Sequence, residues 1–228
     1  MHSHSSRKLL QAFTLLELLV TVAVIAVLIA ITIPVVMKAR ERAQITKSAS
    51  NLRQVYTAFM MYIGDHNDMS FWRGKTGSTP DYVATEGMDW FVHGGKPDGN
   101  NDSQEGLFNK YNPRPLNSYM GNNLEIFRHP SDRRALAMLG GQTHYDAYGN
   151  DYAFNSLGYP GIWDKGLSGE SFSNIQLPGL TILFLEAHLL KPGLSWAGGD
   201  KGNIMMADGR IVFDSLPGPN DPRYKWGL

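Results

Sequence analysis

The residue best placed to do chemistry is Glu17, a lone acid at the start of a long apolar segment. From residue 18 to residue 36 the chain has no charged residue, and only Thr21 and Thr32 interrupt the apolar side chains. At about 1.5 Å rise per residue, a helix of this length crosses roughly 30 Å of hydrocarbon. A carboxylate is costly in lipid and normally marks a partner. Glu17 is therefore predicted to pair with a cation inside the membrane, with a solvated position at the membrane interface as the alternative.

A second candidate site is a loop of alternating oxygen-bearing side chains that suits calcium. Asp98, Asn100 and Asp102 alternate as the first three ligands of an EF-hand loop do. The rest of that pattern is missing, because Ser103 stands where a glycine belongs and Asn109 where a bidentate glutamate belongs. The loop is therefore not an EF-hand. It is either a weaker Ca²⁺ site or a solvated turn, and no other cofactor is predicted.

Familiar catalytic motifs do not occur in the sequence. There is no HExxH, no G-x-S-x-G, no phosphate-binding P-loop and no dinucleotide fingerprint. The histidines His93, His144 and His188 have no partners at metal-ligand spacing. Asp208 has the side chain of a catalytic or metal-binding carboxylate, but Asp208-Gly209 between two apolar runs is more typical of a type I′ hairpin turn. We therefore predict that the protein is not an enzyme.

Charge and composition limit the classes of partner that the protein is expected to bind. The 21 Lys and Arg residues balance the 21 Asp and Glu residues, and the sequence pI is about 7.1. A protein without net charge has no global attraction to a polyanion, so nucleic acid is not expected as a partner. The sequence contains no cysteine, so disulfide bonds cannot stabilise the fold.

The segments that must position the lone carboxylate are predicted to form one long helix with two characters. Residues 13–36 are the apolar, membrane-spanning half, and residues 37–66 continue as an amphipathic half that stops near Gly64. Pro34 removes one helical hydrogen bond, which predicts a kink or a melted turn near Ala30. Apolar residues recur every three or four positions along the second half, namely Ile45, Ala49, Leu52, Tyr56, Phe59 and Ile63. This stripe is predicted to pack on a domain of the same chain, with a coiled coil as the alternative.

The remaining residues, 67–228, are predicted to form a globular head. From about Met69 onward, Gly, Pro, Asn and Asp accumulate, which is typical of short strands and long loops. An apolar run at residues 181–186 and the two arms of a hairpin, residues 204–207 and 210–213, predict a small antiparallel sheet. The fold class is therefore α+β, with the helix stripe packed against that sheet.

The N-terminal segment resembles the processing site of prepilins, the precursors of type IV pilins and of the pseudopilins of type II secretion. Residues 1–12 form a polar, basic leader, and FTLLE follows at residues 13–17. The resemblance implies that a prepilin peptidase cuts between Ala12 and Phe13 and that Phe13 is then N-methylated. Ala12 departs from the glycine that usually precedes the cut in that family.

Two further positions match this family, and they imply how the protein works. Glu17 is the fifth residue of the mature chain and Pro34 the twenty-second, where the family has its glutamate and many members have a proline. In a staggered bundle, such a glutamate pairs with the terminal amine of a neighbouring subunit. The implied fold is pilin-like, and the implied function is that of a structural filament subunit held by one helix in the inner membrane, with its head on the periplasmic side.

The resemblance also implies partners. These are prepilin peptidase, other copies and other pseudopilins in a filament, the inner-membrane assembly platform and membrane lipid. The alternative function is a membrane-tethered binding protein, for DNA uptake or for polysaccharide, that a prepilin signal only delivers. Major pseudopilins of type II secretion also hold calcium in a loop, which supports the candidate loop that starts at Asp98.

Two elements of the head resemble a group of pseudopilin-like proteins. FRHPSD at residues 127–132 resembles F-x-C-P-S-D, and NIMMADGR at residues 203–210 resembles N-V-L-F-A-D-G-H. In that group the cysteine often has a fellow in a C-x-S-N-L-K-Q stretch of the helix, which here reads SASNLRQ. Both cysteine positions are replaced, by Ser48 and His129. Loss of both members of a disulfide would explain this, so Ser48 and His129 are predicted to lie close in space.

Overall fold

The structure is a computed structural model that describes most of the chain. The described residues are 14–71, 91, 93–96, 114–121, 123–133, 135–136, 139–156, 158–159, 166–190 and 199–228. The chain divides into two units, Met1–Glu41 and Arg42–Leu228, and each is described by itself. The predictions for Ala12, Phe13, Asp98, Asn100 and Asp102 lie outside the described residues.

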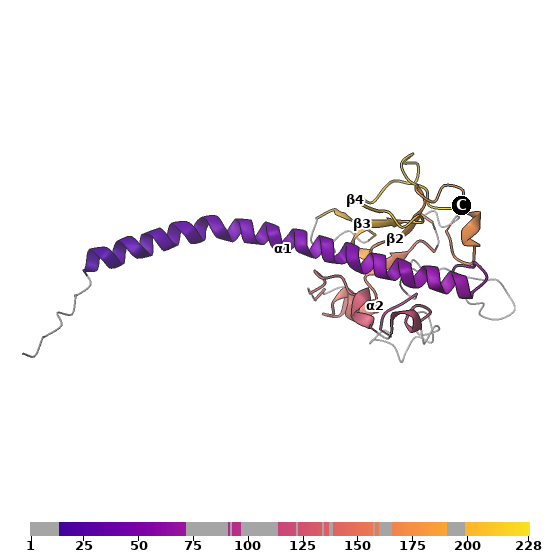
Figure 1. The fold of residues 1–228 in the computed structure, drawn as a ribbon, viewed down its shortest axis with the longest axis horizontal. Coiled ribbons are helices and arrows are strands. Elements are labelled where there is room, and N and C mark those ends of the chain that lie inside the picture. The colour runs from indigo at the N-terminus through magenta and orange to yellow at the C-terminus, as the bar shows by residue number, and fades with distance from the viewer. Residues whose placement is uncertain are drawn as a thin grey trace, which may run out of the picture. The chain divides into compact units, whose positions relative to one another are not determined.

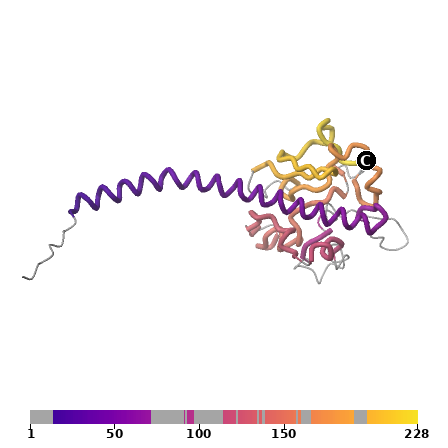
Figure 2. Tube along the Cα trace, viewed as in Figure 1, coloured from indigo at the N-terminus to yellow at the C-terminus, as the bar shows by residue number. Residues whose placement is uncertain are grey.

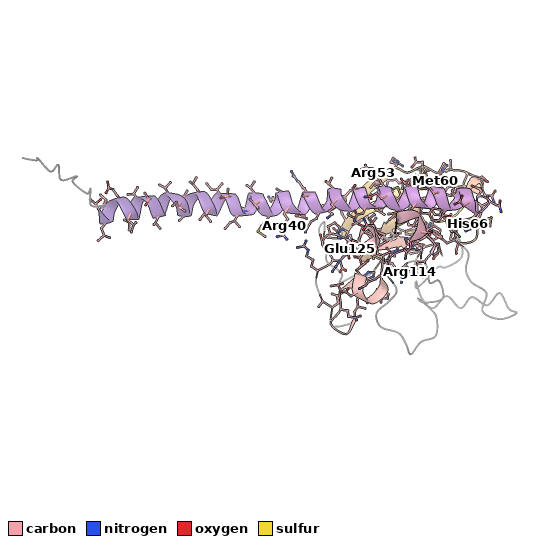
Figure 3. All side chains as sticks on the ribbon, turned by 60° about the horizontal axis from the view of Figure 1, so that its bottom comes forward. Arg40, Arg53, Met60, His66, Arg114 and Glu125 are labelled. Carbon is pink, nitrogen blue, oxygen red and sulfur yellow. The ribbon has the colours of Figure 1, made fainter. Side chains whose placement is uncertain are left out.

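Helix α1 (Leu15–Asp65) begins in the first unit and continues into the second (Figure 1). In the first unit the large apolar side chains from Leu15 to Met37 are 49% to 86% exposed, and they project into open space in Figure 3. Among the described residues, α1 is the one helix long and apolar enough to cross a membrane. This agrees with the membrane-spanning half predicted from the sequence.

Pro34 lies inside α1, and the residues on both sides of it are helical. The predicted melted turn near Ala30 is therefore wrong. A proline inside a helix removes one backbone hydrogen bond and its ring crowds the carbonyl four residues earlier. The residues around Pro34 nevertheless stay helical. Close to this point, the hydroxyl of Thr32 also donates to the backbone carbonyl of Leu28.

One face of α1 is buried in the second unit. Its buried residues are Ser48, Asn51, Leu52, Val55, Ala58, Phe59, Tyr62 and Ile63. They recur at the three- and four-residue spacing that places side chains on one side of a helix. Ala49 and Tyr56, two members of the predicted stripe, lie at its half-buried edges. The face packs against the head of the same chain, so the coiled-coil alternative is not needed to bury it.

Two residues in the left-handed backbone region end α1. Asn67 has a φ of 53° and Asp68 a φ of 65°. The Asp68 N–H turns back to donate to the carbonyl of Ile63 at 2.8 Å, as at many helix C-termini. The Asp68 carboxylate accepts hydrogen bonds from the Ser171 hydroxyl at 2.6 Å and the Ser173 N–H at 2.8 Å. The helix therefore ends at Asp65, one residue beyond the predicted position.

The strands of the described residues form one antiparallel sheet in the order β1-β2-β3-β4. They are β1 (Tyr152–Phe154), β2 (Ile182–Glu186), β3 (Lys201–Met206) and β4 (Ile211–Ser215). Figure 2 shows β3 and β4, near the C-terminal end of the colour scale, running side by side. The sheet and the hairpin predicted from the sequence are confirmed, whereas β1 was not predicted.

The two faces of this sheet pack against different layers. Phe154, Phe184 and Met205 are paired across three strands and belong to the cluster that contains the buried face of α1. The alternate row of Ala153, Leu185 and Ile204 packs with the C-terminal aromatic residues Tyr224 and Trp226 on the other face. All five residues of β2 are buried, as its uninterrupted apolar run predicted.

The turn between β3 and β4 differs from the predicted one. A type I′ turn needs positive φ at both central residues. Gly209 has a φ of 85°, but Asp208 is not among the described non-glycine residues with positive φ. The Met206 N–H donates to the Arg210 carbonyl at 2.8 Å and the Gly209 N–H to the Met206 carbonyl at 2.9 Å, which closes a three-residue loop. Only the glycine adopts the left-handed conformation, because it has no Cβ.

Short helices complete the described part of the head. The one-turn 3₁₀ segments are η2 (Ser118–Met120), η3 (Leu124–Phe127), η5 (Phe172–Asn174) and η6 (Ala187–Leu189). The short α-helix α2 (His144–Tyr148) has Thr143 as its N-cap, whose side chain accepts a hydrogen bond from the N–H of Asp146. In Figure 1, α2 and the strands β2–β4 are drawn on opposite sides of α1.

Candidate functional site

Glu17, the candidate in the apolar half, closes a capping box at the start of α1. Its Oε2 accepts hydrogen bonds from the Thr14 N–H at 2.9 Å and from the Thr14 hydroxyl at 2.8 Å. The Glu17 N–H in turn donates to the Thr14 hydroxyl oxygen at 3.2 Å. The T-x-x-E spacing of residues 14–17 is a sequence signal for this arrangement. Because Thr14 is neutral, these bonds orient the carboxylate without neutralising its charge.

The head contains a second acid in an apolar setting, Glu186 at the end of β2. It is 1% exposed, and it lies on the face of the sheet that α1 covers. Its Oε1 accepts hydrogen bonds from the hydroxyl of Ser48 on α1 and, at 2.7 Å, from the side-chain amide of Asn203 on β3. The Nε2 atom of His129 is 3.3 Å from the same oxygen. The carboxylate thus joins the helix, the sheet and the loop that carries His129.

Hydrogen-bond partners assign the protons on the two histidines beside Glu186. The Ser131 N–H donates to Nδ1 of His129 at 3.1 Å, so the neutral ring carries its proton on Nε2, toward Glu186. His188 Nε2 lies 3.0 Å from the Lys201 carbonyl and donates to it. The other nitrogen of His188, Nδ1, faces Glu186 Oε2 at 3.5 Å. Glu186 is therefore surrounded by donors on Oε1 and by one titratable ring on Oε2.

Burial and these contacts act in opposite directions on the pKa of Glu186. Burial raises it, but the contacts with His129, His188 and Ser48 outweigh burial, so the pKa of Glu186 lies below its ordinary value. Burial also lowers the pKa of His188, and the nearby Glu186 charge offsets this only in part. These contacts favour the charged form of Glu186, and burial favours the neutral form of His188.

This set of residues does not suit a metal ion. A metal would need the lone pair of His129 Nε2, yet the Ser131 N–H fixes the proton on that nitrogen. Within the described ranges, no group of three or more His, Cys, Asp or Glu side chains could hold a metal. The calcium candidates Asp98, Asn100 and Asp102 lie outside those ranges, and their site stays a prediction.

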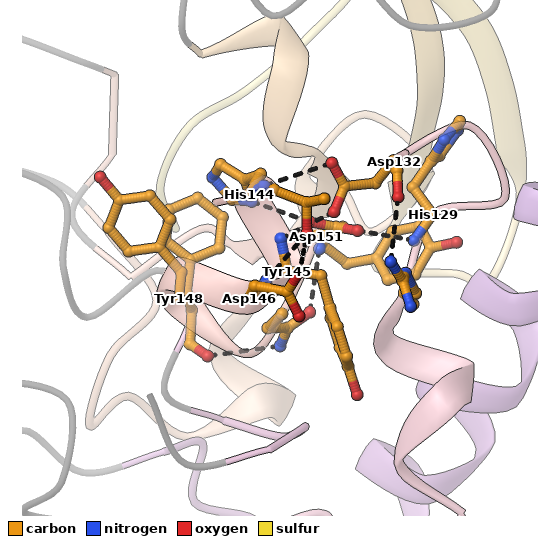
Figure 4. A network of polar contacts seen from close by, with 12 residues as sticks. His129, Asp132, His144, Tyr145, Asp146, Tyr148 and Asp151 are labelled. Atoms are coloured by element: carbon orange, nitrogen blue, oxygen red, sulfur yellow. Dashed lines mark hydrogen bonds and ion pairs between the residues drawn. The ribbon is translucent and has the colours of Figure 1, made fainter. Parts of the chain in front are cut away.

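Another buried acid of the head, Asp151, connects the loop that carries His129 with α2 (Figure 4). Its Oδ2 accepts a hydrogen bond from the His129 N–H at 2.8 Å, and its Oδ1 is 2.8 Å from Nδ1 of His144. Asp132 accepts hydrogen bonds from the N–H groups of His144 at 3.2 Å and Tyr145 at 2.8 Å, which holds the first turn of α2. Burial, together with the nearby Asp132 charge, raises the pKa of Asp151 well above its ordinary value.

The His144–Asp151 pair has the residue types of a catalytic dyad, but both residues are 0% exposed. A substrate has no access to a pair at this depth. The bonds instead connect β1, the loop of residues 127–132 and α2. We interpret the Glu186 and Asp151 contacts as one structural network, called the buried polar network below.

The residues singled out in the head fall partly within this network. Ser48 and His129 both contact Glu186 Oε1, so the structure brings these two side chains to a common atom. Asp208 and Gly209 lie apart from it in the β3–β4 turn, where Asp208 Oδ1 accepts a hydrogen bond from the Arg210 N–H at 2.9 Å. The sequence signal that could have revealed Glu186 is its position as the one charged residue of β2.

Comparison with known proteins identifies the class to which the N-terminal segment belongs. Residues 8–33 match the family described as "Prokaryotic N-terminal methylation motif". The N-terminal segment is therefore that of a prepilin-type protein, the class that includes pilins and pseudopilins. Its helix is long and apolar enough to anchor the chain in a membrane.

A curated relative supports this assignment. The chain is 32% identical over 71 residues to the "Type IV major pilin protein PilA" of Myxococcus xanthus (strain DK1622). The match covers 31% of this chain and 32% of the relative, so it spans about a third of either protein. No solved structure matches the chain.

Proposed function

We propose that the protein is a structural subunit, pilin or pseudopilin, of a type IV pilus-like or type II secretion filament. The observation that carries this proposal is the apolar half of α1. Its large side chains from Leu15 to Met37 are at least 49% exposed in the single chain, and the methylation motif overlaps this half. Packing with the helices of other copies would remove this surface from water and lipid.

Glu17 sets the stagger between subunits in this proposal. Cleavage before Phe13 creates an ammonium group at the new N-terminus, and the Glu17 carboxylate of an adjacent copy neutralises it. The capping box directs the Glu17 carboxylate toward the start of its helix, where such amines would lie. Removing one member of a buried ion pair typically costs about 3–5 kcal/mol. Assembly, rather than folding of the head, would bear this cost.

The partners and the location follow from the same proposal. Prepilin peptidase would cut between Ala12 and Phe13 at the inner membrane, and the mature subunit would then meet other copies, other pseudopilins and the assembly platform. The apolar half would remain in the lipid of the inner membrane until assembly. The head would lie on the periplasmic side.

The test of processing is the intact mass of the protein extracted from membranes. The expected species begins at Phe13 and carries one N-methyl group. An intact Met1 or a cut after the apolar run would contradict the proposal. Ala12→Gly is the matched control, because it restores the residue that prepilins usually have and should be processed at least as completely. Ala12→Trp should leave the leader in place.

The two kinds of filament can be told apart by where the subunit is found. A pilus subunit is expected in filaments sheared from the cell surface, whereas a pseudopilin is expected to stay with the cell envelope. Cells that carry the protein at its normal level should be sheared, and the sheared and cell-bound fractions should be compared by immunoblot.

A further inference from the structure

A polar groove with a volume of about 500 Å³ lies between α1 and the loop of residues 123–133. One wall consists of Lys47, Asn51 and Gln54, which share a face of α1 because they are four and three positions apart. The other wall is the loop itself, which also contributes the apolar surfaces of Ile126 and Pro130. This volume suits a small molecule.

Cations outnumber exposed carboxylates among the residues that line the groove. The lining cations are Lys47, Arg128 and Arg133. Among the described residues, neither Lys47 nor Arg133 forms an ion pair. Glu125 lies 4.0 Å from Arg128, but its side chain is 73% exposed. Solvent screens such a pair strongly, so it leaves most of the positive charge available.

The other lining carboxylate, Asp132, does not offset these cations at the surface. It is 1% exposed, and its two oxygens accept the backbone N–H groups of His144 and Tyr145. The Asp132 carboxylate therefore lies inside the head, against the first turn of α2. The groove presents a net positive surface to solvent.

Arg128 is held in place before any ligand arrives. Its Nη2 donates to the Asp132 carbonyl at 3.3 Å, and its guanidinium carbon lies 5.4 Å from the centre of the Tyr145 ring. The Tyr145 hydroxyl donates to the Leu124 carbonyl at 2.8 Å, and the Arg128 carbonyl accepts the Asn51 amide at 3.2 Å. A guanidinium fixed in this way loses little conformational entropy on binding, and its fork matches the oxygens of phosphate and carboxylate.

We infer that this groove binds a small polyhydroxylated anion, namely a sugar phosphate or a sugar acid. Arg128, Lys47 and Arg133 would pair with the phosphate or carboxylate, and the amides of Gln54 and Asn123 would bond the hydroxyl groups. An extended nucleic acid fits less well. Three clustered cations do not follow a phosphate backbone, and the described residues that line the groove include no Phe, Tyr or Trp on which bases would stack.

The test is calorimetric titration of the full chain, held in micelles of a nonionic detergent. The probes are glucose 6-phosphate, glucuronate and a glucuronate oligosaccharide, with glucose as the neutral reference. Both anionic monomers should bind, glucose should not, and added salt should weaken binding. An oligosaccharide that binds more tightly than the monomer would identify a polymer as the source of the ligand, and equal affinity would identify a free metabolite.

Charge-reversal variants locate the binding. Lys47→Glu with Arg133→Glu should weaken binding by at least about tenfold, because two charge-assisted contacts become repulsive. The matched control is Arg53→Glu, which lies on the same helix about 120° away from the groove residues and should bind normally. Thermal unfolding of each variant checks that the head is folded.

Three results would overturn the inference. The first is no binding of either anionic sugar, and the second is equal affinity in the double variant and in Arg53→Glu. The third is binding of a duplex DNA that neither anionic sugar displaces, which would assign the cations to a polyanion.

Discussion

The two halves of α1 are one continuous helix, yet they depend on different surroundings. Between Leu15 and Met37 the large apolar side chains are at least 49% exposed, whereas in the second unit Leu52, Val55 and Phe59 are 0% exposed. The second half is therefore stabilised by the head of its own chain. The first half has comparable apolar surface but no partner within the described residues.

The difference shows which half of α1 is stabilised by contacts within a single chain. Burial of apolar surface accounts for the second half, because each buried side chain contributes roughly 1.5–3 kcal/mol. The same physical effect requires lipid or other copies for the first half. The first half of α1 contains one acid in an apolar setting, Glu17, and the head that covers the second half contains another, Glu186. Among the described residues, Glu186 receives its hydrogen bonds from distant parts of the chain, whereas Glu17 receives them from Thr14.

The largest expected effect comes from removing an aromatic side chain in the buried half. The Phe59 ring lies 5.2 Å to 5.9 Å from the rings of Phe71, Phe154, Phe172 and Phe184. Phe59→Ala should lower the free energy of unfolding of the head by about 3–5 kcal/mol. The measurement is urea unfolding of the full chain in nonionic detergent, followed by tryptophan fluorescence.

The matched substitution in the first half is Leu28→Ala. Leu28 is 60% exposed, so its loss should leave the unfolding of the head unchanged. An equal loss of stability in both variants would show that the first half also packs on the head, and the contrast between the halves would fail.

A smaller change is expected from a designed disulfide between the helix and the head. Ser48 and His129 both contact Glu186 Oε1, which brings their side chains near each other. Ser48→Cys with His129→Cys should form a disulfide on oxidation, seen as a loss of 2 Da in the intact mass, since two thiol hydrogens leave. The oxidised form should be about 2–4 kcal/mol more stable than the reduced form of the same variant. Two free thiols after oxidation would refute the predicted proximity.

The next effect tests how tightly the buried polar network is packed. A Cβ on Gly202 would lie 2.6 Å from Cε1 of His188 and 2.7 Å from Oε2 of Glu186. Gly202→Ala should therefore cost about 1–3 kcal/mol by overpacking. Gly218→Ala is the control, because no atom lies within 4 Å of its added Cβ. Urea unfolding measures both, and equal stabilities would show that the network is loose.

The smallest expected effect is a pH dependence from His188. Its pKa in the folded head lies below the ordinary value of 6.5, so the unfolded chain binds the proton more readily. The free energy of unfolding should therefore fall as the pH drops below 6.5, and the His188 contribution should be constant above that range. His188→Gln keeps a donor for the Lys201 carbonyl and should remove this slope.

Asp151 changes the free energy of unfolding with pH in the opposite direction to His188. Its raised pKa means that the folded head keeps a proton that the unfolded chain releases, so its contribution falls as the pH rises above the ordinary value of 3.8. The unmodified protein and His188→Gln share this Asp151 contribution. It therefore cancels when the free energy of unfolding of one is subtracted from that of the other. An unchanged slope in His188→Gln would show that His188 is not the titrating group.

Local patterns in the sequence predicted much of the fold. They did not predict contacts between residues that are distant in sequence. The two characters of α1, the buried strand β2 and the β3–β4 hairpin follow from hydrophobic periodicity and an Asp-Gly turn, which neighbouring residues determine. The turn type was wrong because a backbone dihedral of Asp208 decides it. The melted turn at Ala30 was wrong because one lost hydrogen bond does not unfold a helix.

The head network was not predictable for a different reason. Glu186, Asn203 and Ser48 are distant in sequence and meet only through the sheet register and the packing of α1. Hydrophobic patterns report burial, but they do not report which polar groups are paired. In the N-terminal segment the T-x-x-E spacing at Glu17 was readable, and it gives that residue a capping role in addition to the predicted pairing.

We propose that the charge of Glu17, rather than its capping bonds, holds subunits together, and Glu17→Gln separates these two roles. Glutamine serves equally well at this position of a capping box, so the start of α1 is preserved while the charge is lost. The measurement is the yield of filaments from cells in which this variant is the only copy. We expect subunits that are trimmed and methylated at Phe13 but few or no filaments. A normal yield of filaments from trimmed Glu17→Gln subunits would contradict it.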